Sequence, residues 1–389
     1  MRARVATATA VAVALATLAT LATRAHAEAN PVLRFAVDTL VYADSDRVLV
    51  VSPQAAVHGR LDRDGGEASA RVVLDVISAA SVDVVSHATP RFQESRTEVD
   101  LAVSKRFGPW LPSAHYRNSS EPDYSSNDFG AAIERRLHPD ATLSASYDLS
   151  LDEVGRSGTS LATWSRGLTT HTAEVSLTQV VGPRTLLRGV YTLTAQTGYQ
   201  EKPYRYVPLF TPDVMASNTA AGVTLDLGNF DDYRQAERPP EEVPELRIRH
   251  AFGLRLLRYL GAIHGSLRAD YRFYVDSWSL LANSLESELA IPIGKTSRLS
   301  LRGRVHQQTG AFFWHRAYVT APGDIPRWRT MDRDLSPYVT LSSGARYELG
   351  LGDFGLYADL EGTYTRYLDY MFLDSRVALI GQLGVRYPR

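Results

Sequence analysis

The residues with the greatest capacity for chemistry in this sequence are charged, and they occupy every second position of short apolar segments. In the C-terminal half, arginines alternate with Leu, Val, Tyr and Phe, while acidic residues take equivalent positions in neighbouring segments. Alternate residues of a β-strand share one face, so these side chains are predicted to line a common surface. The predicted set is Arg247, Arg249, Arg255, Arg268, Asp270, Arg272, Glu286, Glu288, Arg298, Arg302, Arg304, Arg346, Asp359 and Glu361.

A face of this kind suits two roles. A basic wall opposite acidic groups sets up a transverse field, which orients and selects solutes in a narrow aqueous channel. The same charges could instead pair across strands and fill the interior with salt bridges. The sequence leaves both interpretations open.

Metal and cofactor chemistry has little support in the sequence. The ten histidines are scattered, and five of them could meet only through the fold: His171, His250, His264, His306 and His315. No close ligand spacing occurs, so no metal site and no cofactor are predicted. Asp231–Asp232 and the pair Asp332/Asp334 could bind Ca²⁺, although a solvated acidic loop is the favoured interpretation.

Hydrolytic chemistry is a third hypothesis rather than the favoured one. Ser86–His87 and Trp314–His315 fall in predicted loops, where a Ser/His site could form at the rim of a barrel. The sequence has no Gly-x-Ser-x-Gly nucleophile elbow, no phosphate-binding glycine loop and no dinucleotide fingerprint. We therefore predict no catalytic residues and no enzyme activity.

The elements that would position the charges are amphipathic strands. Between Ile263 and Asp276, every second residue is apolar or small, and the residues between them are mostly polar or charged. In an outer-membrane barrel, the apolar face contacts lipid and the polar face lines the lumen. No second apolar run of helical spanning length follows the N-terminal one, and only helices or closed barrels satisfy the backbone in lipid.

The connections alternate between short and long. Short turns are predicted at Asp62–Glu67, Gly108–Trp110, His138–Asp140, Gly182–Arg184, Leu260–Gly261, Gly294–Thr296 and Gly350–Gly352. If both chain termini lie on the same side of the membrane as the short turns, seven such turns require sixteen strands. The first predicted strand is Leu33–Ala43 and the last is Val377–Tyr387. The predicted fold class is therefore all-β, a transmembrane antiparallel up-and-down barrel of about sixteen strands. Asn218–Leu227 is a candidate extra strand, and fourteen or eighteen strands stay open.

Two long loops bear on function. Gly198–Pro244 is rich in proline and aromatic residues, and Gly310–Arg333 is the second long connection. A loop of more than forty residues is functional or disordered as a rule, and its aromatic content argues against disorder. Folded inward, Gly198–Pro244 would constrict or plug the lumen; folded outward, it would offer a partner-binding surface.

The N-terminus carries the pattern of an export signal. Arg2 and Arg4 precede the uncharged run Val5–Thr23, and Ala25-His26-Ala27 forms a small-x-small cleavage site. Residues 1–27 are thus predicted to be a cleaved signal peptide, and residues 28–389 to form the barrel in a Gram-negative outer membrane. Without cysteine there is no lipidated cysteine and no disulfide. A net charge of −1 gives no indication of nucleic-acid binding.

Several strings resemble an uncharacterised bacterial family, domain of unknown function 3570. They are residues 75–81 (DVISAAS), 83–92 (DVVSHATPRF), 271–278 (YRFYVDSW) and 304–314 (RVHQQTGAFFW). The resemblance implies an outer-membrane barrel without an established activity, and it supplies no catalytic residues.

The favoured function is a porin-like channel or translocation pore for small polar or charged solutes. The alternative is a non-conducting barrel that serves as a structural or assembly component of an envelope complex, and the third hypothesis is the loop-borne hydrolase. Expected partners are outer-membrane lipid and the barrel-assembly machinery. A homo-oligomer or a periplasmic partner stays open.

Overall fold

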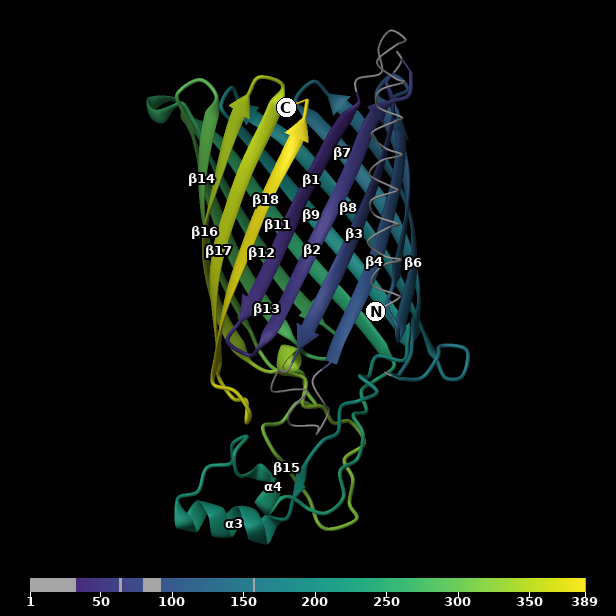
Figure 1. Ribbon diagram of the computed structural model, residues 1–389, viewed down its shortest axis with the longest axis vertical. Coiled ribbons are helices and arrows are strands. Elements are labelled where there is room, and N and C mark those ends of the chain that lie inside the picture. Colours follow the sequence, from purple (N-terminus) through teal and green to yellow (C-terminus); the bar gives the residue numbers. More distant parts are fainter. Residues whose placement is uncertain (1–32, 63–64, 80–91, 157, 389) are drawn as a thin grey trace.

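The computed structural model describes residues 33–62, 65–79, 92–156 and 158–388, and sixteen of its strands close into one antiparallel barrel (Figure 1). The wall strands are β1 (Arg34–Asp44), β2 (Val48–Arg60), β3 (Gly66–Ala79), β4 (Phe92–Lys105), β5 (Trp110–Ser120), β6 (Tyr124–His138), β7 (Ala141–Val154), β8 (Arg166–Gly182), β9 (Thr185–Gly198), β11 (Leu246–Leu260), β12 (Gly265–Asp276), β13 (Leu281–Ile293), β14 (Ser297–Gln308), β16 (Tyr338–Leu351), β17 (Phe354–Tyr367) and β18 (Ser375–Tyr387). The prediction of a sixteen-stranded up-and-down barrel is confirmed. The predicted signal peptide lies outside the described residues.

The first and last wall strands seal the barrel. β1 pairs antiparallel with β18 from Phe35↔Tyr387 to Asp44↔Ala378, and every other wall strand pairs with its neighbour in sequence order. Closure leaves no free strand edge, which would otherwise expose unpaired N–H and C=O groups to lipid or to another chain.

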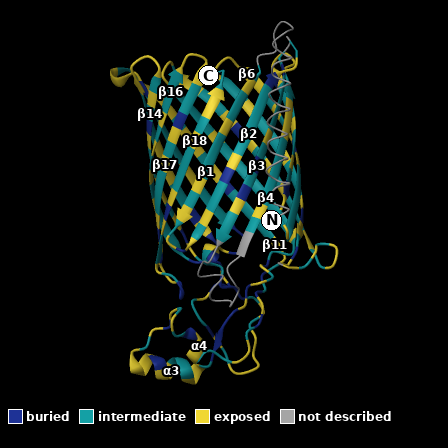
Figure 2. Ribbon diagram, viewed as in Figure 1, coloured by how far each residue is buried: buried dark blue, intermediate teal, exposed yellow. Residues whose placement is uncertain are grey.

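The two faces of each strand differ as the alternation predicts. On β11, Phe252 and Leu254 are about half exposed, whereas Gly253 and Arg255 lie on the opposite face. Large apolar side chains are exposed in the same way around the outside, and Figure 2 shows exposed residues recurring along the strands. This apolar outer surface is what a transmembrane barrel presents to lipid. No helix in the described part of the chain is long and apolar enough to cross a membrane.

Short turns gather at one end of the barrel and longer connections at the other. The seven predicted short turns all fall between consecutive wall strands, and one of them contains a short 3-10 helix, η1 (Gly261–Ile263). The C-terminus lies at the same end (Figure 1). Three connections at the opposite end are also short, at residues 45–47, 121–123 and 277–280. Residues 80–91, which connect β3 to β4, lie outside the described residues.

The long connections fold together into a small unit, here called the cap, which comprises residues 199–245, 309–337 and 368–374. It contains β10 (Leu209–Phe210), β15 (Tyr318–Val319), the helices α3 (Pro212–Ala221) and α4 (Phe230–Tyr233), and the 3-10 helix η2 (Arg333–Leu335). β10 and β15 pair in parallel and join the two longest loops. Figure 1 shows α3, α4 and β15 projecting beyond the barrel rim. Of the two arrangements considered for Gly198–Pro244, the outward one is therefore observed for these elements.

The suggestion of an extra strand at Asn218–Leu227 is wrong. The segment contains the C-terminal half of α3 and the loop that follows it. Thr211 caps the helix by accepting a hydrogen bond from the Val214 N–H, Pro212 follows at the helix start, and Gly222 ends the helix at φ 70°. These start and stop signals determine the local structure, and the short apolar alternation within the segment does not override them.

An apolar core holds the cap together. Phe210, Met331 and Tyr370 are almost completely buried, and they come from three different loops. Trp278 and Phe313 pack edge-on with ring centroids 5.2 Å apart, which ties the β12–β13 connection to the cap. The loops are thus a packed structure and not a set of independent connections.

Candidate functional site

All fourteen charged residues selected from the sequence fall on the face of the wall opposite the exposed apolar side chains. The pairing registers fix this arrangement: Arg255 pairs with Asp270, Asp270 with Glu286, and Glu286 with Arg304. Their neighbours at two-residue steps share the same face. A role in passing solutes stays a prediction, but the geometry allows the contacts of each charge to be assigned.

Strands β11, β12 and β13 carry a continuous ladder of ion pairs. The Arg255 guanidinium donates to Asp270, and Arg268 lies 3.0 Å from the same carboxylate. Arg268 also reaches Glu286 at 2.6 Å and Glu288 at 3.1 Å. Five of the predicted residues are therefore brought together as one network along the inner wall.

A second network links β14 to β17. The Arg302 guanidinium donates to Asp359 at 2.8 Å and 2.5 Å and to Glu361 at 2.8 Å, although β16 lies between the two strands. Gly344 on β16 makes this possible, since a Cβ there would lie 3.0 Å from the Arg302 Nε atom. Arg302 thus lies along the wall, over a position that has no side chain.

The remaining charges near the short-turn end join this network. Arg346 contacts Glu348 at 3.0 Å, and its guanidinium carbon lies 4.1 Å from the centre of the Tyr357 ring. Arg298 contacts the other oxygen of Glu348 at 3.0 Å. Arg346 and Arg298 therefore have acidic partners, and neither is free in the described part of the structure.

Three of the predicted arginines have no ion pair among the described residues: Arg249, Arg272 and Arg304. Arg249 is partly buried beside the ion pair of Arg247 with Asp276, whose closest atoms are 2.6 Å apart. Arg272 and Arg304 are exposed, and both line one cavity of about 400 Å³ in the inner wall. These two guanidinium groups are consequently available to an anionic group in solution.

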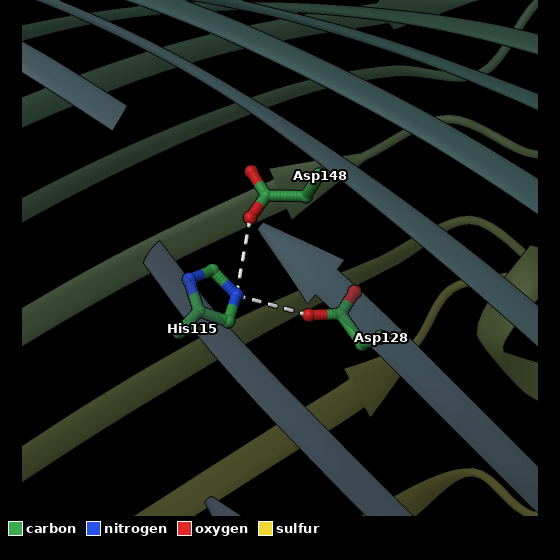
Figure 3. Close-up of side chains that lie close together, drawn as sticks. All are labelled: His115, Asp128 and Asp148. Atoms are coloured by element: carbon green, nitrogen blue, oxygen red, sulfur yellow. Dashed lines mark hydrogen bonds and ion pairs between the residues drawn. The ribbon is translucent and has the colours of Figure 1, made fainter. Parts of the chain in front are cut away.

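A cluster of His115, Asp128 and Asp148 was not predicted from the sequence. The three side chains lie on β5, β6 and β7 and point toward one another (Figure 3). The Nε2 atom of His115 is 3.0 Å from an Asp128 oxygen and 3.2 Å from an Asp148 oxygen. Strand alternation alone could have placed each residue on the inner face, but only the register between strands brings them together.

The five histidines considered from the sequence do not meet. His171 and His250 bond to Tyr147 and Tyr191 on the outer face, and His264 bonds to Tyr259 at a turn. His306 bonds to Ser284 on the inner face, and His315 packs against the Tyr318 ring in the cap.

The hydrolase hypothesis gains no support from these contacts. No carboxylate in the described chain bonds to His306, so the pair that it forms with Ser284 lacks the third member of a triad. Ser86 and His87 lie outside the described residues. In each of the two acidic pairs considered for Ca²⁺, one carboxylate contacts an arginine: Asp231 contacts Arg234, and Asp332 contacts Arg205.

The cap also contains a network of buried charges. Arg205 lies between Glu241 at 3.2 Å and Asp332 at 2.8 Å, with the Arg205 and Glu241 side chains almost fully buried. Burial raises the pKa of Glu241. Burial would also raise the pKa of Asp332, but Arg205 and the backbone N–H of Asp334 outweigh this effect and hold the pKa below its usual range. Each acid therefore depends on Arg205 for compensation of its buried charge.

The fold and its inner wall define a transmembrane β-barrel of the outer-membrane class with a charged interior. Within that class, the chain belongs to the family described as "Protein of unknown function (DUF3570)", whose model matches residues 79–366. The resemblance seen in the sequence is thereby confirmed. No curated protein matches the sequence.

Solved structures with similar folds include a "Bacterial polysaccharide outer membrane secretin", at 7% identity and a TM-score of 0.49, over 92% of this chain and 98% of that one. CdiB from Acinetobacter baumannii has 10% identity and a TM-score of 0.46, over 90% of this chain and 60% of its own. OccK11 (OpdR) from Pseudomonas aeruginosa has 10% identity and a TM-score of 0.40, over 91% and 94%. At such low similarity, none of them establishes what this chain binds or transports.

Proposed function

We propose that this protein is a passive channel for small polar or charged solutes in the outer membrane of a Gram-negative bacterium. A barrel of sixteen strands is wide enough to enclose an aqueous lumen. Solutes would diffuse through that lumen past its charged wall, without a cofactor and without covalent chemistry. The cap stands at the loop-side end, where it would meet solutes before they enter the barrel.

The observation that carries this proposal is the separation of charge around the inner wall. The pairing registers place eight arginines and four acids on the inner face of β11–β14. The arginines are Arg247, Arg249, Arg255, Arg268, Arg272, Arg298, Arg302 and Arg304, and the acids are Asp270, Asp276, Glu286 and Glu288. On β4–β8 the balance reverses, with eight acids to four arginines: Glu94, Glu98, Asp100, Asp128, Glu134, Asp148, Asp152 and Glu174 against Arg96, Arg117, Arg136 and Arg166.

The two walls face each other in part. In the closed strand order, β13 and β14 lie eight places from β4 and β5, which is halfway around a ring of sixteen. A basic wall opposite an acidic wall creates a field across the lumen. Such a field aligns dipolar solutes and gives anions and cations separate paths. Salt bridges formed only to fill the interior would not require this separation.

Planar-bilayer recording of the purified, full-length protein tests the proposal. We expect stepwise conductance in KCl, and a reversal potential in a salt gradient that changes when charges on either wall are neutralised. A matched control is Arg258→Gln, because Arg258 lies on the outer face of β11, in register with Leu267. Correctly folded protein that inserts but never conducts would overturn the channel proposal.

The cap favours a second candidate, a non-conducting barrel that binds an envelope partner. Its apolar core and the buried Arg205 make it a folded surface of the kind that a partner could recognise. In that case conductance would be absent, and a stoichiometric partner would copurify from outer membranes. Conductance with no such partner would favour the channel.

A further inference from the structure

The cluster of His115, Asp128 and Asp148 has the composition and spacing of a metal site. We propose that these three residues bind a divalent first-row transition ion, with Zn²⁺ as the representative, on the inner wall of the barrel. The proposal is independent of conductance, because a barrel that does not conduct could bind the ion equally well. It also departs from the prediction that the chain has no metal site.

The spacing of the ligand atoms supports this assignment. The His115 Nε2 atom lies 3.0 Å and 3.2 Å from one oxygen of each aspartate, and all three ligand atoms lie within 4.8 Å of one another. Metal–ligand bonds of about 2.1 Å that meet at roughly 90–110° separate neighbouring ligand atoms by about 3.0–3.4 Å. A single N–H at Nε2 can point at only one of the two oxygens, whereas a metal ion between the three atoms would satisfy them all.

The surrounding sheet is built to accommodate the cluster. His115, Gly130 and Asp148 are directly paired positions on three adjacent strands, and Asp128 is two residues from Gly130 on the same face. A Cβ at Gly130 would lie 2.0 Å from the His115 Cε1 atom and 2.4 Å from an Asp148 oxygen. The cluster therefore occupies the space that any side chain at position 130 would need, and paired strands hold it rigidly.

The charge of the cluster also calls for a cation. Asp128 and Asp148 have no arginine or lysine partner among the described residues, since Arg117, which pairs with Asp128 in register, donates to Asp100 at 2.7 Å. All three side chains are partly exposed on the inner face, so an ion has access to them. One imidazole with two carboxylates suits Zn²⁺, Mn²⁺ or Fe²⁺ better than Ca²⁺ or Mg²⁺, which prefer oxygen ligands alone.

Isothermal titration of the full-length protein in detergent, after treatment with a chelator, tests the site. We expect one Zn²⁺ to bind per chain, with Mg²⁺ and Ca²⁺ failing to compete. We expect at least tenfold weaker Zn²⁺ binding in each of three ligand variants, His115→Asn, Asp128→Asn and Asp148→Asn. Even the loss of a residue that only hydrogen-bonds to a metal ligand weakens binding by roughly tenfold or more. His58→Gln is the matched control, because His58 is another inner-wall histidine and, within the described residues, contacts one carboxylate, that of Glu67.

The variant Gly130→Ala tests whether Zn²⁺ binding depends on the positions of the three ligands as well as on their identity. It keeps all three ligands but displaces them, so Zn²⁺ binding should weaken as much as in the ligand variants. Gly189→Ala is its control, since a Cβ at Gly189 meets no atom within 4 Å. Heat-dependent gel mobility checks the folding of each variant.

X-ray absorption of the Zn²⁺-loaded wild-type protein gives a readout that does not depend on variants. One nitrogen and at least two oxygen neighbours of the metal are expected. Absence of saturable Zn²⁺ binding would overturn the proposal. Binding that is unchanged in the His115 and Asp148 variants would also overturn it, and would move the ion elsewhere, for example to the acidic cluster of Glu94, Glu121 and Asp123.

Discussion

Replacing Arg272 and Arg304 by glutamine should make the proposed channel less selective for anions. Both guanidinium groups line the same cavity on the basic wall, and neither has an ion-pair partner among the described residues. The double change therefore removes two positive charges that have no ion pair among the described residues, so no acid there loses a contact. Glutamine retains hydrogen-bonding capacity and most of the side-chain length, so the shape of the lumen should change little.

The magnitude follows from Coulomb's law. For an ion about 7 Å from a guanidinium in a water-like dielectric, the interaction is roughly 0.6 kcal/mol, which screening at 0.1 M salt reduces to about 0.3 kcal/mol. Two lost charges then disfavour an anion by about 0.6 kcal/mol and favour a cation by the same amount. The ratio of anion to cation permeability should fall by about eightfold, since 1.4 kcal/mol corresponds to roughly a factor of ten.

The assay is the reversal potential of single channels in a tenfold KCl gradient near 0.1 M. Arg258→Gln, on the outer face, should leave the permeability ratio unchanged, and raising the salt concentration should diminish the effect of the double variant. A change of less than twofold in the double variant would refute the assignment of these arginines to the ion path, and so would an equal change in the Arg258 control.

Three further predictions concern stability. Phe210→Ala removes a fully buried ring from the cap core and should destabilise the cap by about 3–5 kcal/mol, so limited proteolysis should cut residues 199–245 sooner while the barrel keeps its heat-dependent gel mobility. Arg205→Met leaves Glu241 and Asp332 without their shared partner and should cost the cap about 3–5 kcal/mol; protease resistance equal to wild type would contradict this. Gly384→Ala would place a Cβ 2.5 Å from the Tyr357 ring and 2.6 Å from Asp38, so the melting temperature should fall by an amount corresponding to about 1–3 kcal/mol, whereas Gly381→Ala on the same strand, with no atom within 4 Å, should melt like wild type.

The strands could be predicted because a lipid-facing strand carries an apolar residue at every second position. Phe252 and Leu254 alternate with Gly253 and Arg255, and that pattern determines both the element and the face. The short turns could be predicted equally well, because each of them interrupts the alternation of apolar and polar residues. Closure by β1 and β18 followed from an even strand count, since an open edge is excluded in lipid.

Contacts between strands could not be predicted in the same way, because they depend on register. His115 and Asp148 are 33 positions apart in the sequence, and a shift of one residue between β5 and β6 would turn their partners to the other face. The fold of the cap could not be predicted from the sequence for a different reason. Phe210, Met331 and Tyr370 belong to three loops without any periodic pattern, and only tertiary packing brings them together.

Glycine positions on the inner wall determine which non-adjacent strands have side chains in contact. His115 and Asp148 meet across Gly130, Arg302 reaches β17 over Gly344, and the Tyr357 ring occupies the space beside Gly384. The inner surface of a barrel is concave, so side chains from strands two places apart converge over the strand between them, provided that its residue is glycine. Side chains held in this way lie along the wall instead of projecting from it. In the proposed channel, the bridged charges would therefore shape the field in the lumen while taking up little of its cross-section.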